Sequence, residues 1–154
     1  MLSLNLPTYD TKITTREGKT VIYDLIRRRF VALTPEEWVR QHFIHFLVNH
    51  KGYPQSLMAN EIQLSLNGMK KRCYTVLYGR NLAPRMIIEY KAPHIIIDQK
   101  VFSQISRYNL VLKVDYLIVS NGLEHYCCQM DYAKQSYSFL RDIPDYVSLA
   151  SPQP

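Results

Sequence analysis

Hydrophobic and polar residues follow periods that change from one segment of the chain to the next. In residues 34–52 (TPEEWVRQHFIHFLVNHKG) the apolar positions recur at helical spacing. Thr34 suits the N-cap, Pro35 suits the first helical position, and Glu37 completes a capping box with Thr34. The pattern predicts a helix over 34–52, whose core-facing stripe consists of Val39, Phe43, Phe46 and Leu47.

Residues 60–78 (NEIQLSLNGMKKRCYTVLY) are typical of a β-hairpin. Apolar and polar residues alternate on both sides of Asn67-Gly68, which is the strongest short-range signal for a tight hairpin turn. A two-residue turn places Glu61 opposite Tyr74. One face of the hairpin is then mostly apolar, and the other is polar and basic.

The remaining segments predict further strands and a second helix. Residues 20–26 (TVIYDLI) are expected to form a short edge strand. The RRR run at 27–29 is interpreted as a solvated charge run, with phosphate binding as the alternative. The later expected elements are a loop (79–84), a strand (85–91), a helix (98–110) with Val101, Ile105 and Leu110 pointing inward, and strands at 113–122, 123–131 and 136–141.

This order of elements predicts one α/β domain. A helix, three strands, a helix and a strand (αβββαβ) give a mixed central β-sheet flanked by helices. We expect the domain to cover residues 20–146, between an extended leader (1–19) and a frayed tail (147–154). The length of 154 residues fits a single hydrophobic core.

Composition and charge restrict the functions to which the chain is suited. Its residues are 47% hydrophobic and 21% charged, as in ordinary soluble globular proteins. Because the sequence has no run of about 18 apolar residues and no secretory signal, we expect a cytoplasmic protein that does not act at a membrane. The formal net charge of +6 suits a polyanionic partner.

Cysteine and histidine do not indicate a disulfide framework or a zinc site. The three cysteines form no CxxC pair. His42 and His45 are spaced to share a metal ion, but without a third ligand nearby we expect them on a solvated helix face. The sequence also lacks the GxSxG, P-loop and GxGxxG motifs, so esterase, kinase and dehydrogenase functions have no support.

The chemistry of greatest interest lies in the segment RMIIEYKAPH (85–94), where an apolar strand ends in Glu89 and Lys91. Residues two apart on a strand point to the same face, so a carboxylate and an ammonium group converge there. Such a pair suits metal-assisted phosphodiester hydrolysis, in which the carboxylate holds Mg²⁺ and the lysine lies near the scissile phosphate. The alternative is a surface ion pair at the end of a strand.

The ordered set of these motifs resembles the PD-(D/E)xK nuclease superfamily, and more closely the N-terminal nuclease domain of type I restriction enzyme R subunits and its small stand-alone relatives. The resemblance covers most of residues 20–146 and implies a restriction-endonuclease-like core. The segments that carry it are TPEEWVRQ (34–41), KKRCYTVLY (70–78), IIEYKAP (87–93), QISRY (104–108) and YLIVSNG (116–122).

The resemblance implies roles for residues of the ExK and QxxxY motifs. Glu89 and Lys91 match the metal ligand and the catalytic lysine. Gln104 and Tyr108 match a QxxxY pattern on the following helix. In relatives with this pattern, these two residues face the site and help to hold nucleic acid.

The metal ligands implied by the resemblance include one clear departure. Tyr74 occupies the position at which the family carries its central metal-binding Asp, and a neutral phenol is a poor Mg²⁺ ligand. Glu61, opposite Tyr74, either replaces the missing carboxylate or pairs with a neighbouring cation. On the first helix the family has an acidic position, for which Glu36 is the better candidate because Glu37 is expected to cap the helix. The alternative is that either acid serves only to stabilise the positive end of the helix dipole.

We therefore expect a DNA-directed, Mg²⁺-dependent (or Mn²⁺-dependent) endonuclease-like domain whose site is degenerate at Tyr74. The alternative is an inactive module of the same fold that binds DNA or a protein, and restriction-modification subunits are candidate partners. The sequence does not indicate an oligomeric state. The residues expected to neutralise DNA phosphates are Lys70, Arg72, Arg80, Lys91 and Arg107.

Overall fold

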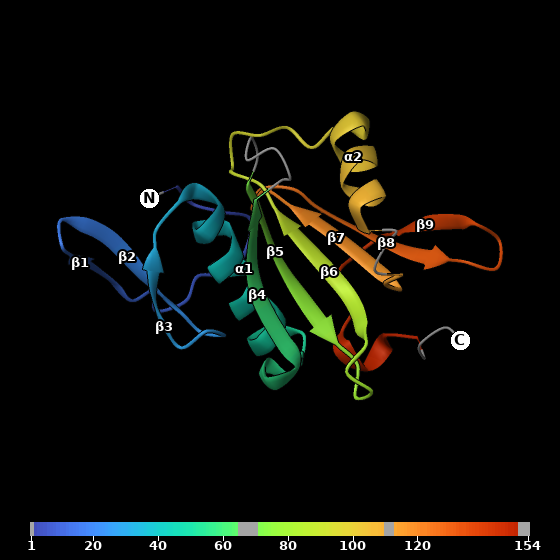
Figure 1. Cartoon of the computed structure of the whole chain (residues 1–154), viewed down its shortest axis with the longest axis horizontal. Helices are drawn as coiled ribbons and strands as arrows, with labels where there is room; N and C mark the ends of the chain where they lie inside the picture. Colours follow the sequence, from blue (N-terminus) through green and yellow to red (C-terminus); the bar gives the residue numbers. More distant parts are fainter. Residues whose placement is uncertain (1, 65–70, 110–112, 151–154) are drawn as a thin grey trace.

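A six-stranded mixed sheet forms the centre of the molecule (Figure 1). The computed structural model describes residues 2–64, 71–109 and 113–150. The strands lie in sequential order, with β6 and β7 parallel and every other neighbouring pair antiparallel. They are β4 (Met58–Leu64), β5 (Lys71–Tyr78), β6 (Pro84–Tyr90), β7 (Tyr116–Ser120), β8 (His125–Asp131) and β9 (Ser136–Leu140).

Two helices cover opposite faces of this sheet. Because successive side chains of a strand point to opposite faces, Ile88 of β6 packs with α1 (Pro35–His50), whereas Ile87 packs with α2 (Gln99–Asn109). The predicted order of elements and the restriction-endonuclease-like mixed sheet flanked by helices are thus confirmed. The predicted pairing of Glu61 with Tyr74 is confirmed as well. The Asn67-Gly68 turn lies outside the described residues.

Both helices bury the stripes that the sequence pattern indicates, with some differences. The hydroxyl of Thr34 accepts a hydrogen bond from the Glu37 N–H at 3.1 Å, which confirms the predicted N-cap. In α1, Val39, Phe43 and Leu47 are fully buried, while Phe46 is half-buried. In α2, Ile105 is buried and Val101 is half-buried, whereas Leu110 lies outside the described residues. Phe102 is buried too, although the predicted stripe omits it.

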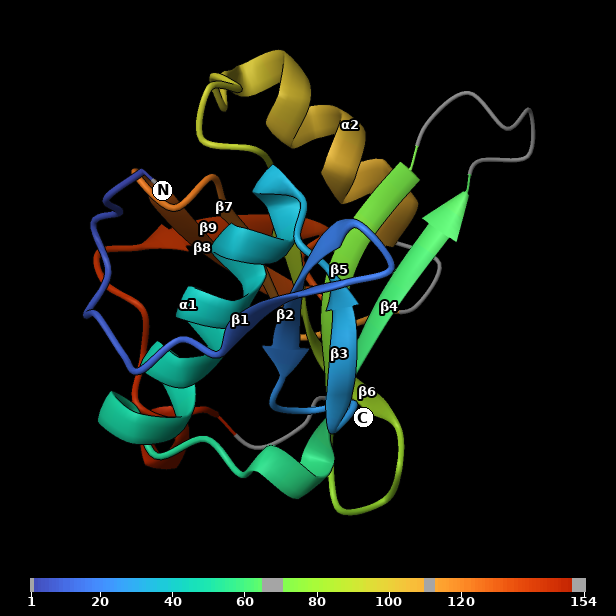
Figure 2. The ribbon, with the colours of Figure 1, turned by 90° about the vertical axis from the view of Figure 1, so that its left-hand side faces the viewer.

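A separate three-stranded antiparallel sheet precedes α1. It consists of β1 (Ile13–Arg16), β2 (Lys19–Asp24) and β3 (Arg29–Ala32). Figure 2 shows it in front of α1 and the main sheet. The prediction that residues 20–26 form an edge strand is wrong, because β2 is the central strand with β1 and β3 on either side. β1 lies within the expected leader, so this sheet begins before residue 20.

The leader also packs against α1 through aromatic contacts. The ring of Tyr9 stacks on His45, with centroids 3.7 Å apart, and meets the edge of His42. His42 is only 5% exposed, so its expected place on a solvated helix face is wrong. Burial lowers the pKa of both histidines below their ordinary value.

An internal ion pair ties α1 to the sheet. The Glu37 carboxylate accepts hydrogen bonds from Arg40 at 2.7 and 2.8 Å, from Arg27 at 2.9 Å and from Gln41 at 2.9 Å. Arg40 is fully buried and also donates to the backbone carbonyls of Glu61 and Tyr74. Burial alone would lower the pKa of Arg40, but hydrogen bonding to Glu37 and its charge raise that pKa above the ordinary value. Arg40 therefore connects α1 to β4 and β5.

A second polar network joins the three-stranded sheet to the main sheet. The buried carboxylate of Asp24 accepts hydrogen bonds from Arg27 and from the side-chain amide of Asn60 on β4. Asn60 in turn accepts a 2.6 Å hydrogen bond from Thr75, whose hydroxyl also lies 2.9 Å from that of Tyr90. Arg27 is thus a structural partner of two acids, and its interpretation as part of a solvated charge run is wrong.

The C-terminal end packs against the domain. Residues Tyr146–Ser148 form a short 3-10 helix, as do residues Gln55–Leu57. Leu149 joins the core on the α1 side, and the Ala150 N–H donates to the hydroxyl of Tyr116 at 2.9 Å. The prediction of a frayed tail from residue 147 is therefore wrong for these two residues. Among the helices of the described residues, none is long and apolar enough to cross a membrane.

We predict that Glu37→Gln lowers the free energy of unfolding by about 3 kcal/mol, because it leaves the buried Arg40 guanidinium without its countercharge. Urea denaturation measures the change. Glu36→Gln is the matched control on the same helical turn, where we expect a change within about 0.5 kcal/mol. Equal effects of the two substitutions would contradict the assigned role of Glu37.

A pH dependence follows from Asp24. Burial alone would raise its pKa, but hydrogen bonds and charge from Arg27, together with Asn60, hold the pKa below the model-peptide value of 3.8. The stabilisation is therefore complete above the unfolded-state pKa and is lost as the pH falls through the lower folded-state pKa. We expect Asp24→Asn to be about 2 kcal/mol less stable than the wild type at neutral pH, a gap that narrows on acidification. A gap independent of pH in urea titrations would refute this.

Candidate functional site

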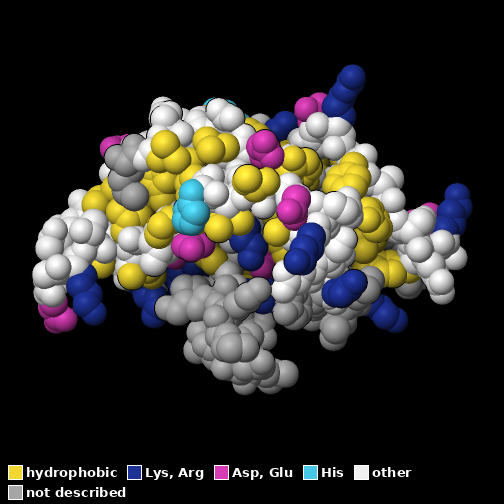
Figure 3. Space-filling view, turned by 90° about the horizontal axis from the view of Figure 1, so that it is seen from above, with side chains coloured by type: hydrophobic (Ala, Val, Ile, Leu, Met, Phe, Trp, Pro, Cys, Tyr) yellow, Lys and Arg dark blue, Asp and Glu magenta, His cyan; other side chains and the backbone are white. Residues whose placement is uncertain are grey.

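The candidate site lies at the end of the main sheet where the parallel strands β6 and β7 finish and β5 begins. Figure 3 looks down on this end and shows Lys and Arg side chains on α2 and near the centre of the face. Backbone pairing places Tyr74 of β5 directly opposite Glu89 of β6. Lys91 follows β6, and its N–H donates to the Ser120 carbonyl of β7, so the chain stays attached to the sheet through this position.

Glu89 is buried and faces two cations. Its side chain is 2% exposed, and Nη2 of Arg72 donates to its Oε1 at 2.6 Å. Nε of Arg72 also donates to Oε1 at 3.2 Å, and Nζ of Lys91 lies 3.8 Å from Oε2. Glu89 and Lys91 share one face of the sheet, as predicted, but Arg72 holds the carboxylate more closely than Lys91 does. The Arg72 and Lys91 side chains are 16% and 29% exposed, so both reach the surface.

Tyr74 completes this cluster as a neutral group. The Arg72 guanidinium carbon lies 5.1 Å from the centre of its ring, close enough for a cation–π contact. Burial and the charge of Glu61 raise the pKa of the Tyr74 phenol, while Arg72 opposes the shift. The phenol therefore stays protonated at neutral pH, and Tyr74 does not supply the charged oxygen of a metal-binding aspartate.

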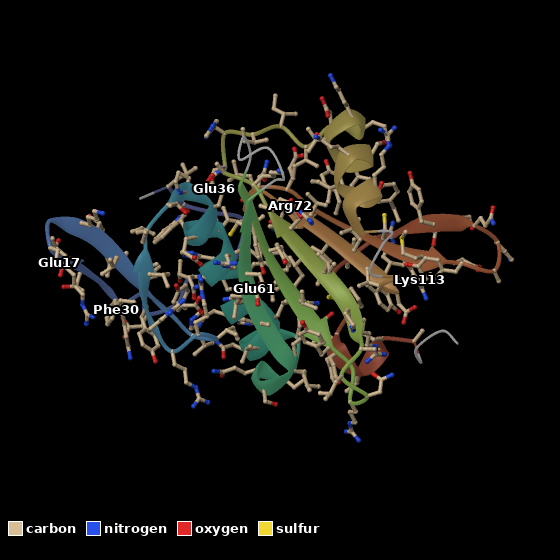
Figure 4. All side chains as sticks on the ribbon, viewed as in Figure 1. Glu17, Phe30, Glu36, Glu61, Arg72 and Lys113 are labelled. Atoms are coloured by element: carbon tan, nitrogen blue, oxygen red, sulfur yellow. The ribbon has the colours of Figure 1, made fainter. Side chains whose placement is uncertain are left out.

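The other predicted metal ligands do not join Glu89. Glu61 is exposed on β4, although it lies opposite Tyr74 in the backbone register. Glu36 belongs to α1, which packs on the opposite face from the side chain of Glu89. Figure 4 shows Glu36 and Glu61 apart from each other on their separate elements. The Glu37 carboxylate, which was expected to cap the helix, is held instead by Arg27 and Arg40.

The residues predicted to contact nucleic acid do not all lie near Glu89. Arg107 is exposed on α2, as is Gln104, and this helix covers the face towards which Glu89 points. Arg80 is exposed in the loop beyond the far end of β5, and strand residues 73–78, at about 3.3 Å each, lie between it and Arg72. Arg80 therefore does not belong to the cluster formed by Glu89, Arg72 and Lys91. Lys70 and the side chain of Tyr108 lie outside the part of the chain that the structure describes.

These positions test whether the site suits Mg²⁺. Within residues 2–64, 71–109 and 113–150, no group of three or more His, Cys, Asp or Glu side chains is arranged to hold a metal ion. One carboxylate remains at the site, and its oxygens already face Arg72 and Lys91. Mg²⁺ binding by a protein relies on carboxylates free to coordinate it, so the described residues do not fit a resident Mg²⁺ ion.

Comparison with known proteins assigns the chain to a family. The sequence profile of the type I restriction enzyme R protein N terminus matches residues 35–144. The chain belongs to this family. The match includes α1, the whole six-stranded sheet and α2, whereas the three-stranded sheet precedes it. No curated protein and no solved structure was found to match the chain.

Within this member of the R-protein N-terminus family, Arg72 is the site residue whose role the sequence interpretation missed. It was assigned to DNA phosphates, yet it pairs with Glu89. The diagonal position of Arg72, two residues before the partner of Glu89, is the signal that could have revealed the contact. That signal needs the register between β5 and β6.

We predict that the wild-type chain shows no saturable Mn²⁺ binding at Glu89, whereas the double variant Tyr74→Asp/Arg72→Gln gains it. The variant adds a carboxylate opposite Glu89 and removes the competing guanidinium. Isothermal titration calorimetry should show a saturable isotherm for the double variant and none for the wild type under the same conditions. Adding Glu89→Gln to the double variant should abolish the gain. Metal binding that survives this third change would place the ion elsewhere.

Proposed function

We propose that this chain is a non-cleaving, DNA-binding version of the type I restriction enzyme R protein N-terminal domain. The observation that carries the proposal is the ion-paired Glu89, a buried carboxylate matched by Arg72 and Lys91 at the surface end of the sheet. One negative charge facing two positive charges leaves an excess of positive charge. Such a group favours a phosphate over a metal cation.

The surroundings of this cluster support contact with a DNA backbone. Lys91 is partly exposed, and Lys100 and Arg107 are exposed on α2, above the same face of the sheet. Lysine and arginine side chains that reach phosphates release condensed counterions, which makes binding strong at low salt and insensitive to base sequence. The net charge of +6 has the sign that such binding requires.

Mg²⁺-dependent endonuclease activity is the second candidate function. The observation that supports it is that Lys91 lies on the same face of the sheet as Glu89, as an ExK motif requires. Nζ of Lys91 is 3.8 Å from Oε2 of Glu89. Cleavage would need Arg72 to leave the carboxylate and the missing ligands to come from elsewhere. The family supports a restriction-modification context, in which DNA and partner subunits in the cytoplasm are the expected partners.

The test is binding of a fluorescein-labelled duplex, followed by anisotropy over a range of salt concentrations. We expect Lys91→Gln and Arg107→Gln each to weaken binding to all duplex sequences alike and to reduce the salt slope by about one. Arg80→Gln is the charge-matched control at the opposite end of β5, and it should bind like the wild type. Plasmid incubated with Mg²⁺ or Mn²⁺ should stay intact.

Two outcomes would overturn the proposal. Metal-dependent cleavage that disappears in Glu89→Gln would establish the endonuclease function instead. No duplex retention at low salt would remove DNA binding and leave a protein-interaction role for this domain.

A further inference from the structure

The three-stranded sheet presents an open outward face that combines cations with aromatic rings. Backbone pairing assigns the side chains to faces, because opposed residues of antiparallel strands share a face. Tyr23 pairs with Phe30, and Arg16 pairs with Lys19 two steps further along the alternation. The backbone carbonyl of Lys12 accepts a hydrogen bond from the Tyr23 N–H, so Lys12 lies opposite Tyr23 and on the same face of the sheet. The outward face thus carries Lys12, Arg16, Lys19, Tyr23 and Phe30.

The opposite face of this sheet is the one that packs inward. Ile22 is fully buried there, and Asp24 is buried against Asn60 of β4. On the outward face, Lys12, Arg16 and Lys19 are exposed, while Tyr23 and Phe30 are half-exposed. Figure 4 places Phe30 on the side of β3 that is remote from the main sheet. The two rings are therefore held by the strands and still accessible to solvent.

The cations and rings of this face contact one another. The guanidinium carbon of Arg16 lies 4.2 Å from the centre of the Phe30 ring, and Nζ of Lys12 lies 5.5 Å from the centre of the Tyr23 ring. The two rings meet edge to face with centroids 5.4 Å apart. A planar guanidinium lying over a ring offers a stacking surface to a base and a positive charge to the adjoining phosphate.

The charge of this sheet is complementary to a nucleic acid. Residues 12–32 contain only two acids, Glu17 and Asp24. Asp24 is buried on the inward side and paired with Arg27. Glu17 lies at the tip of the β1–β2 hairpin, which Figure 4 shows at the far end of the sheet. The outward face itself therefore bears cations without an acid between them.

We propose that the outward face of β1–β3 binds single-stranded nucleic acid, with bases stacking on Phe30, Tyr23 and the Arg16 guanidinium while Lys12 and Lys19 contact phosphates. Unpaired bases expose the flat surfaces that such stacking requires, and a duplex hides them. A protein partner is a poorer fit, because lysines are depleted at the cores of protein interfaces. This face precedes residues 35–144, so the family match does not assign it.

The test uses the full chain and a fluorescein-labelled thymidine oligonucleotide in anisotropy titrations. Phe30→Leu keeps an apolar side chain but removes the ring, and we expect it to weaken binding about tenfold, within the range for loss of one stacked base. Arg16→Gln should weaken binding and reduce the salt slope by about 0.7. Arg80→Gln is the charge-matched control. Ultraviolet crosslinking followed by mass spectrometry should attach thymidine to Tyr23 or Phe30.

Duplex binding, measured on the same variants, separates this proposal from the proposed function at Lys91 and Arg107. Loss of oligonucleotide binding in Phe30→Leu with duplex binding retained supports a separate single-strand surface. Oligonucleotide affinity within twofold of the wild type in both Phe30→Leu and Arg16→Gln would overturn it. So would crosslinks confined to α2. A thermal unfolding curve for each variant identifies any substitution that acts by unfolding the sheet.

Discussion

The buried ion pair between Glu37 and Arg40 is the interaction on which the arrangement of this domain depends. Either charge alone would be unfavourable in the interior by several kcal/mol, so the two side chains must be buried together. Arg40 also donates to the carbonyls of Glu61 and Tyr74, and Arg27 reaches Glu37 from the segment between β2 and β3. One charged cluster thus holds α1, the β4–β5 pair and the three-stranded sheet in fixed positions. The fixed β5 presents Tyr74 beside Glu89.

Glu89, at the surface end of the main sheet, is a second buried carboxylate that needs partners of opposite charge. It is as buried as Glu37, so it too needs positive partners. The partners differ, because Arg40 is fully buried whereas Arg72 and Lys91 reach solvent. An internal pair such as Glu37–Arg40 can only stabilise the fold. Cations that touch a buried acid on one side and water on the other can also meet a phosphate, as Arg72 and Lys91 can. Arg27, the second cation beside Glu37, is 19% exposed as well, but it faces two acids, Asp24 and Glu37. Among the described residues, the Glu89 cluster differs because its two cations face a single acid.

Local patterns predicted the parts of this structure that local interactions determine. Thr34 and Pro35 define the start of α1, and the expectation of a two-residue turn at Asn67-Gly68 was enough to pair Glu61 with Tyr74. The placement of Glu89 and Lys91 on one face follows from strand geometry alone. The family resemblance, carried by the motifs rather than by periodicity, indicates the correct family from the sequence alone.

What the sequence could not predict depends on long-range pairing. The register between β5 and β6 shifts at an irregularity between Leu77 and Tyr78, so counting through the loop does not place Arg72 against Glu89. β1 lies in the polar segment TKITTR, where alternation is too weak to indicate a strand, and β2 therefore looked like an edge. Arg27 looked like one of three solvated arginines because its partners Asp24 and Glu37 meet only in the folded chain.

The distribution of charge links the interior to the proposed binding surfaces. The buried acids Asp24, Glu37 and Glu89 each have an arginine partner, so these interior clusters absorb none of the +6 surplus. The surplus lies on the remaining side chains, where it can attract polyanions. Screening limits each cation to a range of about 8 Å at physiological salt, so contacts must be local. The three-stranded sheet occupies one end of the long axis in Figure 1, and α2 lies away from it. The two proposed surfaces would therefore act through separate contacts, one with paired and the other with unpaired nucleic acid.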